Sequence, residues 1–458
     1  MGLWDPGLVW EPRMERAGRS AKTALAIAAT GMVGLAIAVS VAIVVGLMSA
    51  PPASAAQSGL VYAGCQSSPD GPVEPSCSQL EGLSYTGAFA VSLDGTSAYA
   101  SFPDGVSVYR RAPDGQLSFQ ECFSATGEAP CTQVPGVLGT ARDIAVPPDG
   151  RSVYLAGSSR RETLIGFQRD PADGTLTFSS CSVSDYGGGP GPPGCPLGPF
   201  QRALQVESSR DGRTIYVADE GCADNTGECF ASVGVYTRDP ATSLLTPSGR
   251  SRPATQGHGP FAVTPVGGTV YELDSDFGTI SVHKRIGGSG LKRTQCLWPR
   301  KRRFYGPCKR VRKMGKAEAI AVSPHGSSVV TVVNPKRGKS WLTLFDRARN
   351  GKLSFERRAF DKRLRSVSDL RFTSDGTLIA ASGAGEDSFL LRFKVNPKRG
   401  TVALAQCLSS AKRSGCTRLP ELRGLSEIAA REPHLYATVA DPATGSGLNA
   451  VLRFRAAG

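Results

Sequence analysis

The chain has 458 residues, of which 40% are hydrophobic and 20% are charged, and its formal net charge is +14. This composition excludes an intrinsically disordered chain, which combines low hydrophobicity with high charge. The 54 glycines and 32 prolines are plentiful for a helical protein and suit short strands joined by tight turns. We therefore expect an all-β fold.

The N-terminal segment is predicted to direct the chain to a membrane. Residues 1–22 are a basic cytoplasmic n-region, residues 23–50 are a signal or membrane-anchor helix without charges, and residues 51–57 are a linker. The basic residues before the apolar run place the following chain outside the cytoplasm. The run is longer than a usual signal-peptide core and long enough to span a bilayer. Cleavage after Ala55 would secrete the protein and an uncleaved helix would anchor it to the plasma membrane, and the sequence leaves both open.

Twelve cysteines in an exported chain indicate disulfides formed in an oxidising compartment. They fall into six sequential couples with 6 to 13 intervening residues, and the gaps between couples are far longer. We expect each couple to close its own loop, with two unpaired buried thiols as the alternative for the fourth couple. The couples are Cys65 with Cys77, Cys122 with Cys131, Cys181 with Cys195, Cys222 with Cys229, Cys296 with Cys308, and Cys407 with Cys416.

One pattern occurs seven times along the chain, with a period of 49 to 62 residues. Each copy has an apolar alternating strand, an Asp-Gly-type hairpin turn and a second strand ending in a Tyr-Val-Ala-like run. A third strand follows each copy, and most third strands lead into a Pro/Asp/Gly turn and a fourth strand. The copies cover residues 90–99, 145–154, 206–216, 262–271, 321–330, 372–379 and 428–436.

Four antiparallel strands at this period are typical of a β-propeller blade. A single blade cannot bury both of its faces, so the blades must pack in a ring. The last copy stops after its third strand at 451–454, while residues 58–65 look like a fourth strand without a blade of its own. We therefore predict a seven-bladed β-propeller over residues 58–458, closed by an N-terminal strand that completes the last blade and leaves no open edge.

The Asp-Gly turns, the Tyr-Val-Ala-like strands and the Val-x-Val-Phe-like third strands resemble the lactonase or YVTN-repeat family of seven-bladed propellers, within the wider WD40/YVTN-like repeat superfamily. The resemblance covers 58–458 and implies the fold. Enzymatic members of this family are lactone hydrolases or cyclases with His, Arg and Glu around one mouth of the ring. Their Pro-x-His opening of the innermost strand is not reproduced here: the equivalent stretch reads Gly259-Pro260-Phe261-Ala262, with His258 before the proline.

The four histidines argue against catalysis. His258 precedes an innermost strand, His283 falls in a third strand, and His325 and His434 lie at turns, so we expect no two of them to meet. We assign no catalytic residue. The sequence favours a non-catalytic extracytoplasmic binding or scaffold module, with a lactone hydrolase of the 6-phosphogluconolactonase-like propellers as the alternative.

The charge is distributed unevenly. Residues 284–365 hold 24 Lys/Arg against four acids, a local charge of +20, so the rest of the chain sums to about −6. Outside a cell such a surface favours anionic polymers, and we expect an anionic cell-envelope polymer or another protein as the partner. The alternative is a solvated basic loop without a dedicated partner. The predicted anion-binding residues are Arg300, Lys301, Arg302, Arg303, Lys309, Arg310, Arg312 and Lys313.

Acidic residues gather around the fourth cysteine couple, at Asp219, Glu220, Asp224 and Glu228. Closely spaced oxygen ligands on a constrained loop could hold calcium. The spacing does not match the helix-loop-helix calcium pattern, so a plain solvated loop is the alternative. We expect no other cofactor, a monomer, and contact with a membrane only through an uncleaved N-terminal helix.

Overall fold

A computed structural model describes most of the propeller region. The chain divides into two units, Met1–Ala55 and Ala56–Gly458. The first unit, with the predicted n-region and signal or anchor helix, lies outside the described residues. Within the described stretches, no helix is both long and apolar enough to cross a membrane. The described residues are 59–69, 76–84, 88–134, 139–158, 162–184, 191–222, 229–251, 259–265, 268–287, 290–299, 308–335, 339–384, 387–440 and 448–456.

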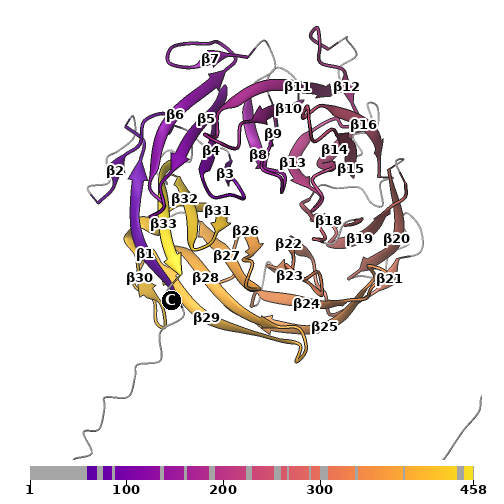
Figure 1. Cartoon of the computed structure of the whole chain (residues 1–458). Coiled ribbons are helices and arrows are strands. Elements are labelled where there is room, and N and C mark those ends of the chain that lie inside the picture. Colours follow the sequence, from indigo (N-terminus) through magenta and orange to yellow (C-terminus); the bar gives the residue numbers. More distant parts are fainter. Residues whose placement is uncertain are drawn as a thin grey trace, which may run out of the picture. The chain divides into compact units, whose positions relative to one another are not determined.

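Seven sheets are arranged in a ring around a central axis (Figure 1). In each blade four antiparallel strands run from the innermost to the outer edge. Blade 1 contains β3 (Phe89–Val91), β4 (Ser97–Phe102), β5 (Gly105–Arg111), β6 (Leu117–Ser124) and β7 (Thr132–Gln133). Blade 2 contains β8 (Thr140–Ala145), β9 (Ser152–Ser158), β10 (Glu162–Arg169), β11 (Leu176–Ser184) and β12 (Leu197–Gly198). Blade 3 contains β13 (Ala203–Ser208), β14 (Thr214–Cys222), β15 (Cys229–Arg238) and β16 (Leu245–Arg250).

The remaining blades follow the same order. Blade 4 contains β17 (Phe261–Val263), β18 (Thr269–Asp274), β19 (Thr279–Arg285), β20 (Leu291–Trp298) and β21 (Lys309–Arg310). Blade 5 contains β22 (Ala317–Val322), β23 (Ser328–Val333), β24 (Trp341–Arg347) and β25 (Leu353–Phe360). Blade 6 contains β26 (Val367–Phe372), β27 (Thr377–Ala384), β28 (Asp387–Asn396), β29 (Thr401–Ser409) and β30 (Thr417–Arg418), followed by the short 3-10 helix η1 (Pro420–Leu422). Blade 7 contains β31 (Leu425–Arg431), β32 (His434–Ala440), β33 (Leu448–Ala456), β1 (Leu60–Ser67) and β2 (Ser78–Gln79).

The predicted ring closure is confirmed. The N-terminal strand β1 pairs antiparallel with β33, from Leu60 opposite Ala456 to Ser67 opposite Ala450. Figure 1 shows the indigo β1 beside the yellow β33, although the two strands stand at opposite ends of the chain. Pairing these two strands removes the open edge that a three-stranded last blade would present.

The turns between strands divide the ring into two faces. Turns from the first to the second strand and from the third to the fourth lie on one face, which we call the hairpin face. The connections that carry most of the cysteines lie on the other, the loop face. In the Asp-Gly turn of blade 2, Asp149 accepts a hydrogen bond from the backbone of Arg151 at 3.1 Å, and Gly150 has a φ of 65°. Glycine adopts this left-handed conformation without a steric penalty, which explains the repeated Asp-Gly pair.

Five of the six predicted cysteine couples form disulfides within their own loops, as expected. Each disulfide joins the fourth strand of a blade to the return segment, whose two-residue strand pairs parallel with the end of the fourth strand. Five disulfides indicate an oxidising, extracytoplasmic environment. The bonds join Cys65 with Cys77, Cys122 with Cys131, Cys181 with Cys195, Cys296 with Cys308, and Cys407 with Cys416.

The fourth couple differs in its place in the blade. Cys222 and Cys229 stand opposite each other in the β14–β15 ladder, between the second and third strands of blade 3. Their side chains are outside the described part, so a bond between them stays a prediction.

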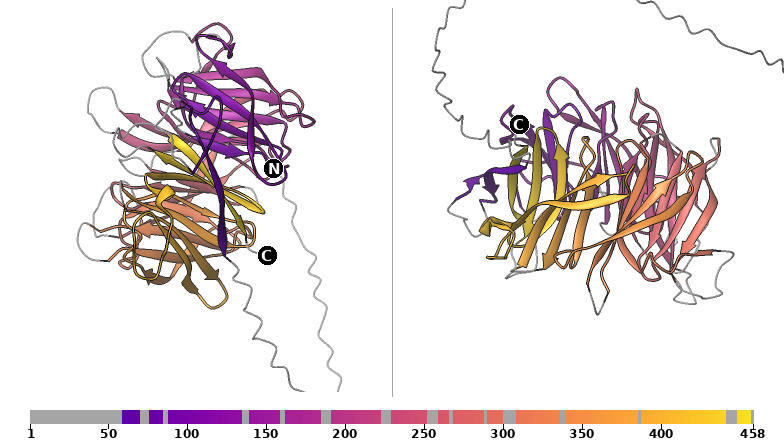
Figure 2. Two further views of the ribbon diagram at one scale, coloured as in Figure 1. Left: turned by 90° about the vertical axis from the view of Figure 1, so that its left-hand side faces the viewer. Right: turned by 90° about the horizontal axis from the view of Figure 1, so that it is seen from below.

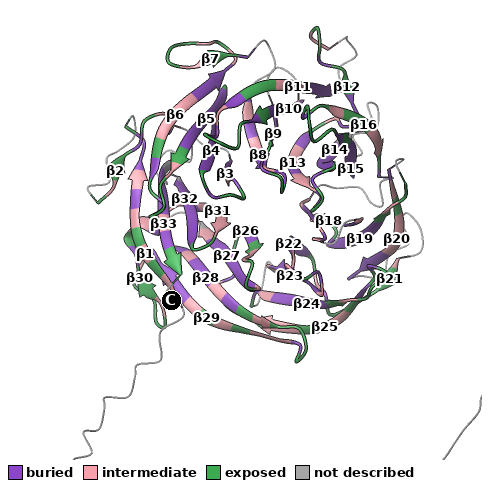
Figure 3. Cartoon of the chain, in the orientation of Figure 1, coloured by how far each residue is buried: buried purple, intermediate pink, exposed green. Residues whose placement is uncertain are grey.

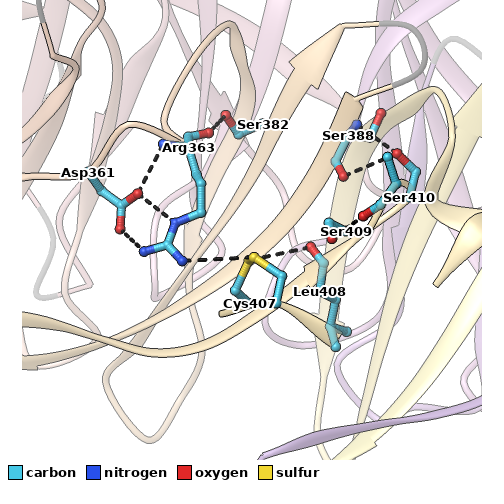
Figure 4. The surroundings of a disulfide bond; sticks show 10 residues. Asp361, Arg363, Ser382, Ser388, Cys407, Leu408, Ser409 and Ser410 are labelled. Atoms are coloured by element: carbon cyan, nitrogen blue, oxygen red, sulfur yellow. Dashed lines mark hydrogen bonds and ion pairs between the residues drawn. A yellow bond between two sulfur atoms is a disulfide. The ribbon is translucent and has the colours of Figure 1, made fainter. Parts of the chain in front are cut away.

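Blade 5 has no cysteines and uses an ion pair at the corresponding turn. Asp361 and Arg363 are joined at 2.6 Å, and a second Arg363 nitrogen lies 3.8 Å from the sulfur of Cys416. Figure 4 shows this pair beside the disulfide of blade 6. The return segment of blade 5 therefore packs on the disulfide of its neighbour.

The core is distributed between neighbouring blades rather than gathered at the axis. Between blades 2 and 3, for example, Tyr154 and Leu164 pack against Val206 and Ile215. Figure 3 shows buried residues concentrated on the middle strands and exposed ones along the outer strands and turns, and Figure 2 shows the blades packed around the ring from the side. The innermost strands are therefore free to present polar side chains to the axis.

Candidate functional site

The innermost strands bring five charged side chains together at the centre of the ring. They are Asp143 on β8, Glu207 on β13, Asp369 and Arg371 on β26, and Glu427 on β31. Alternating residues of a strand face the same neighbour, so one short strand can supply two such side chains. We call these five residues the channel cluster.

Each carboxylate of the channel cluster also joins two blades. An innermost strand is the edge of its sheet. The N–H groups on the side away from the second strand have no partner within the blade. In this ring the acid of one blade accepts a hydrogen bond from the innermost strand of the next. The pairs are Asp143 with the N–H of Val206 at 2.9 Å, Glu207 with Val263 at 3.0 Å, Asp369 with Ile428 at 2.9 Å, and Glu427 with Phe89 at 2.9 Å.

Arg371 is the cation of the cluster. Its guanidinium lies 3.0 Å from Asp369 and 3.5 Å from Glu427. The side chain of Arg371 is 44% exposed. Solvent therefore reaches Arg371 at the centre of the ring. The nearby carboxylates, first among them Asp369, raise the pKa of Arg371, so it stays charged.

Three carboxyl groups of the cluster have pKa values above their ordinary values. Burial raises the pKa of Glu207 to about 8 and that of Asp143 to about 6, although attraction to Arg371 opposes both shifts. Burial also raises the pKa of Glu427 well above its usual value. At neutral pH, Glu207 is therefore mainly a proton donor and Asp143 mainly a base. With Arg371 to hold an anion, the cluster contains the groups that acid-base chemistry requires.

The raised pKa of Glu207 makes a testable difference to stability. Because its folded pKa lies above the ordinary value of 4.5, ionisation opposes folding, and this penalty grows as the pH rises from about 4.5 toward 8. The Glu207→Gln variant keeps an oxygen for the N–H of Val263 and removes the charge. We expect its melting temperature to exceed that of the wild type by about 3 °C at pH 8.5 and to match it at pH 4.5.

Thermal denaturation followed by circular dichroism at the two pH values measures this difference. The matched control is Glu128→Gln at an exposed site on blade 1, which should behave as the wild type at both pH values. A Glu207→Gln protein less stable than the wild type at pH 8.5 would contradict a Glu207 that is protonated near neutral pH.

The channel cluster was not identified from the sequence, although a signal for it exists. In each blade, one residue of the innermost strand lies opposite the third residue of the second strand, which gives seven equivalent positions in the ring. Five of them are alanine, and the exceptions are Glu207 and Arg371. The set is Ala90, Ala145, Glu207, Ala262, Ala321, Arg371 and Ala429. A charge in a position otherwise held by alanine marks the site.

The predicted anion-binding residues lie in part outside the described chain. Arg300, Lys301, Arg302 and Arg303 are not described. Lys309 and Arg310 form β21, Arg312 and Lys313 follow it, and all four are exposed.

Blade 5 extends this basic surface. Arg358 of β25 donates to the carbonyl of Lys313 and lies over the ring of Trp341, 4.6 Å from its centroid. The ring of Phe360 lies 5.7 Å from that of Trp341, and 58% of Phe360 is exposed. We call this surface the basic rim; it comprises Lys309, Arg310, Arg312, Lys313 and Arg358, with Trp341 and Phe360.

The predicted calcium residues lie on β14 and beyond it. Asp219 is buried, and its oxygens accept hydrogen bonds from the backbone of Gln201 and Arg202 at 2.6 and 3.0 Å and from Ser232 at 2.7 Å. Glu220 pairs with Arg202 at 2.5 Å. Asp224 and Glu228 lie outside the described residues. Within the described chain no group of three acidic, histidine or cysteine side chains could hold a metal ion, and calcium stays a prediction.

The described histidines belong to different blades. His283 is buried on β19, with its Nε2 atom 2.7 Å from a carboxylate oxygen of Glu272. His325 is exposed in a turn of blade 5, and His434 begins β32 beside Arg111. His258 lies outside the described residues. These three histidines therefore do not form a common site.

Comparisons with known proteins concern the fold. No protein-family model matches the chain, and no curated protein matches it. Among solved structures it is similar to hydrazine synthase of Kuenenia stuttgartiensis, with 14% identity over 85% of this chain and 100% of that one and a TM-score of 0.50. It is also similar to a candidate 6-phosphogluconolactonase of Bacteroides fragilis, with 14% identity, 70% and 82% coverage and a TM-score of 0.49. The periplasmic gluconolactonase of Pseudomonas aeruginosa gives 17% identity, 70% and 84% coverage and a TM-score of 0.49.

At such identities a shared fold does not carry a shared function, because this architecture hosts unrelated activities. The seven blades and the closing strand agree with the fold expected from the repeat. The chain is a seven-bladed β-propeller, and lactonase-like propellers are among its structural neighbours.

Proposed function

We propose that this chain is an extracytoplasmic, non-catalytic binding propeller whose basic rim engages an anionic polymer of the cell envelope. The main support is a group of exposed cations without ionic partners. Within the described chain, Lys309, Arg310, Arg312 and Lys313 form no ion pair, whereas Arg238 on blade 3 is paired with Asp149. Like charges held together repel one another, and an anionic ligand relieves that repulsion.

The shape of the rim also suits an extended ligand. The cations run from the outer edge of blade 4 to the outer strand of blade 5, where Arg358 bonds the turn of the neighbouring blade. The exposed Phe360 provides an apolar surface next to these charges. A polymer with repeating anions can contact several cations at once, so its affinity for the rim should fall steeply with salt.

Replacing the four rim cations by glutamine tests this proposal. The rim variant changes Lys309, Arg310, Arg312 and Lys313. The control variant changes Arg210, Arg213, Lys398 and Arg399, which are exposed on the hairpin face, and therefore has the same net charge. With polyphosphate and heparin as probes, we expect the rim variant to bind at least tenfold more weakly at 50 mM salt, while the control stays within about twofold of the wild type. Equal losses of affinity in both variants would mean that the protein attracts polyanions by its net charge alone, and this result would contradict a dedicated binding rim.

A lactone hydrolase at the channel cluster is the second candidate, and the observation that favours it is the combination of Glu207, Asp143 and Arg371. Glu207 would protonate a leaving oxygen, Asp143 would take a proton from water, and Arg371 would hold a developing anion. We rank this candidate second because each carboxylate already bonds the backbone of the next blade. Lactone turnover by the wild type that disappears in Arg371→Gln would reverse this ranking.

A further inference from the structure

Arginines at the ends of the third strands fill the spaces between blades on the hairpin face. In each of these arginines the backbone N–H donates to a carbonyl of the first hairpin in the same blade, which makes the positions equivalent. The donors and acceptors are Arg111 and Thr96, Arg169 and Arg151, Arg238 and Arg213, Arg285 and Gly268, and Arg347 and Ser327. We call these five residues the junction arginines.

The side chain of a junction arginine reaches the preceding blade. Arg169 lies 2.8 Å from the carboxylate of Asp94 and 2.9 Å from the hydroxyl of Ser97, which begins the second strand of blade 1. Arg238 makes the same two kinds of contact with blade 2, to the carboxylate of Asp149 at 2.7 Å and to the hydroxyl of Ser152 at 2.7 Å. It also donates to the hydroxyl of Tyr154 at 3.2 Å. Both guanidinium groups are buried. In these two junctions the guanidinium site consists of a turn aspartate and a hydroxyl. Two other junction arginines, Arg111 and Arg347, bond a tyrosine of the preceding blade, whose turn has no aspartate.

The junction between blades 6 and 7 retains the acceptors and lacks the arginine. Ala456 occupies the equivalent position, because its N–H donates to the carbonyl of Pro433 at 2.9 Å. Ile379 stands where blade 2 has Tyr154. The aspartate of the turn, Asp375, and the hydroxyl residue, Thr377, are both present.

A cleft of ≈ 500 Å³ occupies this junction. Asp375, Thr377, Ile379, Ala456, Glu432 and Arg392 line it, together with neighbouring residues of blades 6 and 7. The acceptors of a guanidinium site therefore face open space here.

The junction between blades 5 and 6 shows that the arginine and the turn aspartate can be lost together. There Val395 takes the arginine position, and the turn of blade 5 has His325 in front of Gly326 instead of an aspartate. Aspartate without arginine is thus a particular feature of the junction between blades 6 and 7.

Arg392 of β28 does not take the place of a junction arginine. It comes from the same blade as Asp375, and its nearest nitrogen is 3.9 Å from the carboxylate. The junction arginines Arg169 and Arg238 approach their aspartates to 2.8 and 2.7 Å. Asp375 itself accepts hydrogen bonds from Thr373 and Thr377, and 54% of its side chain is exposed. Its carboxylate is oriented by these bonds and still accessible.

We propose that the cleft between blades 6 and 7 binds the guanidinium group of an arginine side chain or of a similar alkylguanidine. The ligand would donate to Asp375 and Thr377, as Arg169 does to Asp94 and Ser97. Its alkyl chain would lie against Ile379 and Ala456, and the exposed Glu432 adds negative charge at the edge of the cleft. This site is on the hairpin face and is separate from the basic rim.

Calorimetric titration of the full chain tests the proposal with N-acetyl-arginine amide and its citrulline counterpart, which has nearly the same shape and no charge. We expect the arginine compound to bind at least tenfold more tightly, because a charged bidentate contact is lost in citrulline. Ala456→Arg should fill the cleft and Asp375→Asn should remove the acceptor, so both variants should lose this preference. Asp346→Asn, an exposed acid of blade 5 outside the cleft, should keep it.

A glycine-serine peptide with one central arginine distinguishes the source of the ligand. Tighter binding of the peptide than of the amide would identify a protein segment, and equal binding would identify a small molecule. Equal affinity for arginine and citrulline compounds, or a preference that survives in both Ala456→Arg and Asp375→Asn, would overturn the proposal.

Discussion

Removing residues 1–67 will lower the melting temperature by roughly 10 °C or more, whereas removing residues 1–56 will leave it unchanged. The longer deletion takes away β1, which supplies the outer strand of blade 7. The side chain of Gln406 bonds both the N–H and the C=O of Leu60, at 2.7 and 2.8 Å, and Gln66 does the same to Leu117 at 2.8 Å. One strand therefore connects blades 6, 7 and 1.

The loss of β1 also exposes the edge of β33, which is a template for pairing with other chains. We expect aggregation on heating in addition to the lower melting temperature. Because the deletion leaves Cys77 without Cys65, the deleted protein should also carry Cys77→Ser, and the full-length protein with both Cys65→Ser and Cys77→Ser serves as the control for the disulfide. Scanning calorimetry of the three proteins separates the two contributions, and an unchanged melting temperature after deletion would refute closure by β1.

Replacement of Arg169 by methionine should cost about 3–5 kcal/mol of stability. The side chain of Arg169 is fully buried and bonds Asp94, Thr96, Ser97 and the carbonyl of Gly150. Methionine fills similar volume and leaves the carboxylate and the buried hydroxyl of Ser97 without their partner. Lysine should recover little, because a single ammonium cannot reproduce the forked contacts of a guanidinium.

Urea unfolding followed by tryptophan fluorescence measures this effect. Arg110→Met is the matched control, since Arg110 is an exposed arginine in the third strand of blade 1. This substitution should lower the free energy of unfolding by less than about 1 kcal/mol. Similar unfolding midpoints for Arg169→Met and Arg110→Met would show that the junction arginines do not hold the blades together.

The architecture could be predicted because the information is local and repeated. A hairpin of alternating strands is visible seven times in the sequence, four times with an Asp-Gly turn, and the missing fourth strand of the last repeat points to residues 58–65. The five described disulfides followed from short spacing for the same reason. Each of these features depends on neighbours in the chain rather than on contacts between blades.

The channel cluster and the junction arginines depend on contacts between blades. Innermost strands have irregular register, for example between Ala141 and Asp143, so simple alternation does not tell which side chain faces the next blade. The arginine that ends each of five third strands is visible in the sequence, yet its partner Asp94 or Asp149 belongs to the preceding repeat. Only the packing of one blade on the next brings these groups together.

The most direct test of the proposed function is one titration of residues 57–458 with polyphosphate at 50 and 300 mM salt, with hydrolysis of a gluconolactone panel followed in the same samples. The binding role predicts an affinity that falls at least tenfold at the higher salt, because exposed cations are screened, and no lactone turnover above the buffer rate. Lactone turnover that persists at 300 mM salt, without binding of polyphosphate, would contradict the binding role and place the function in the central channel.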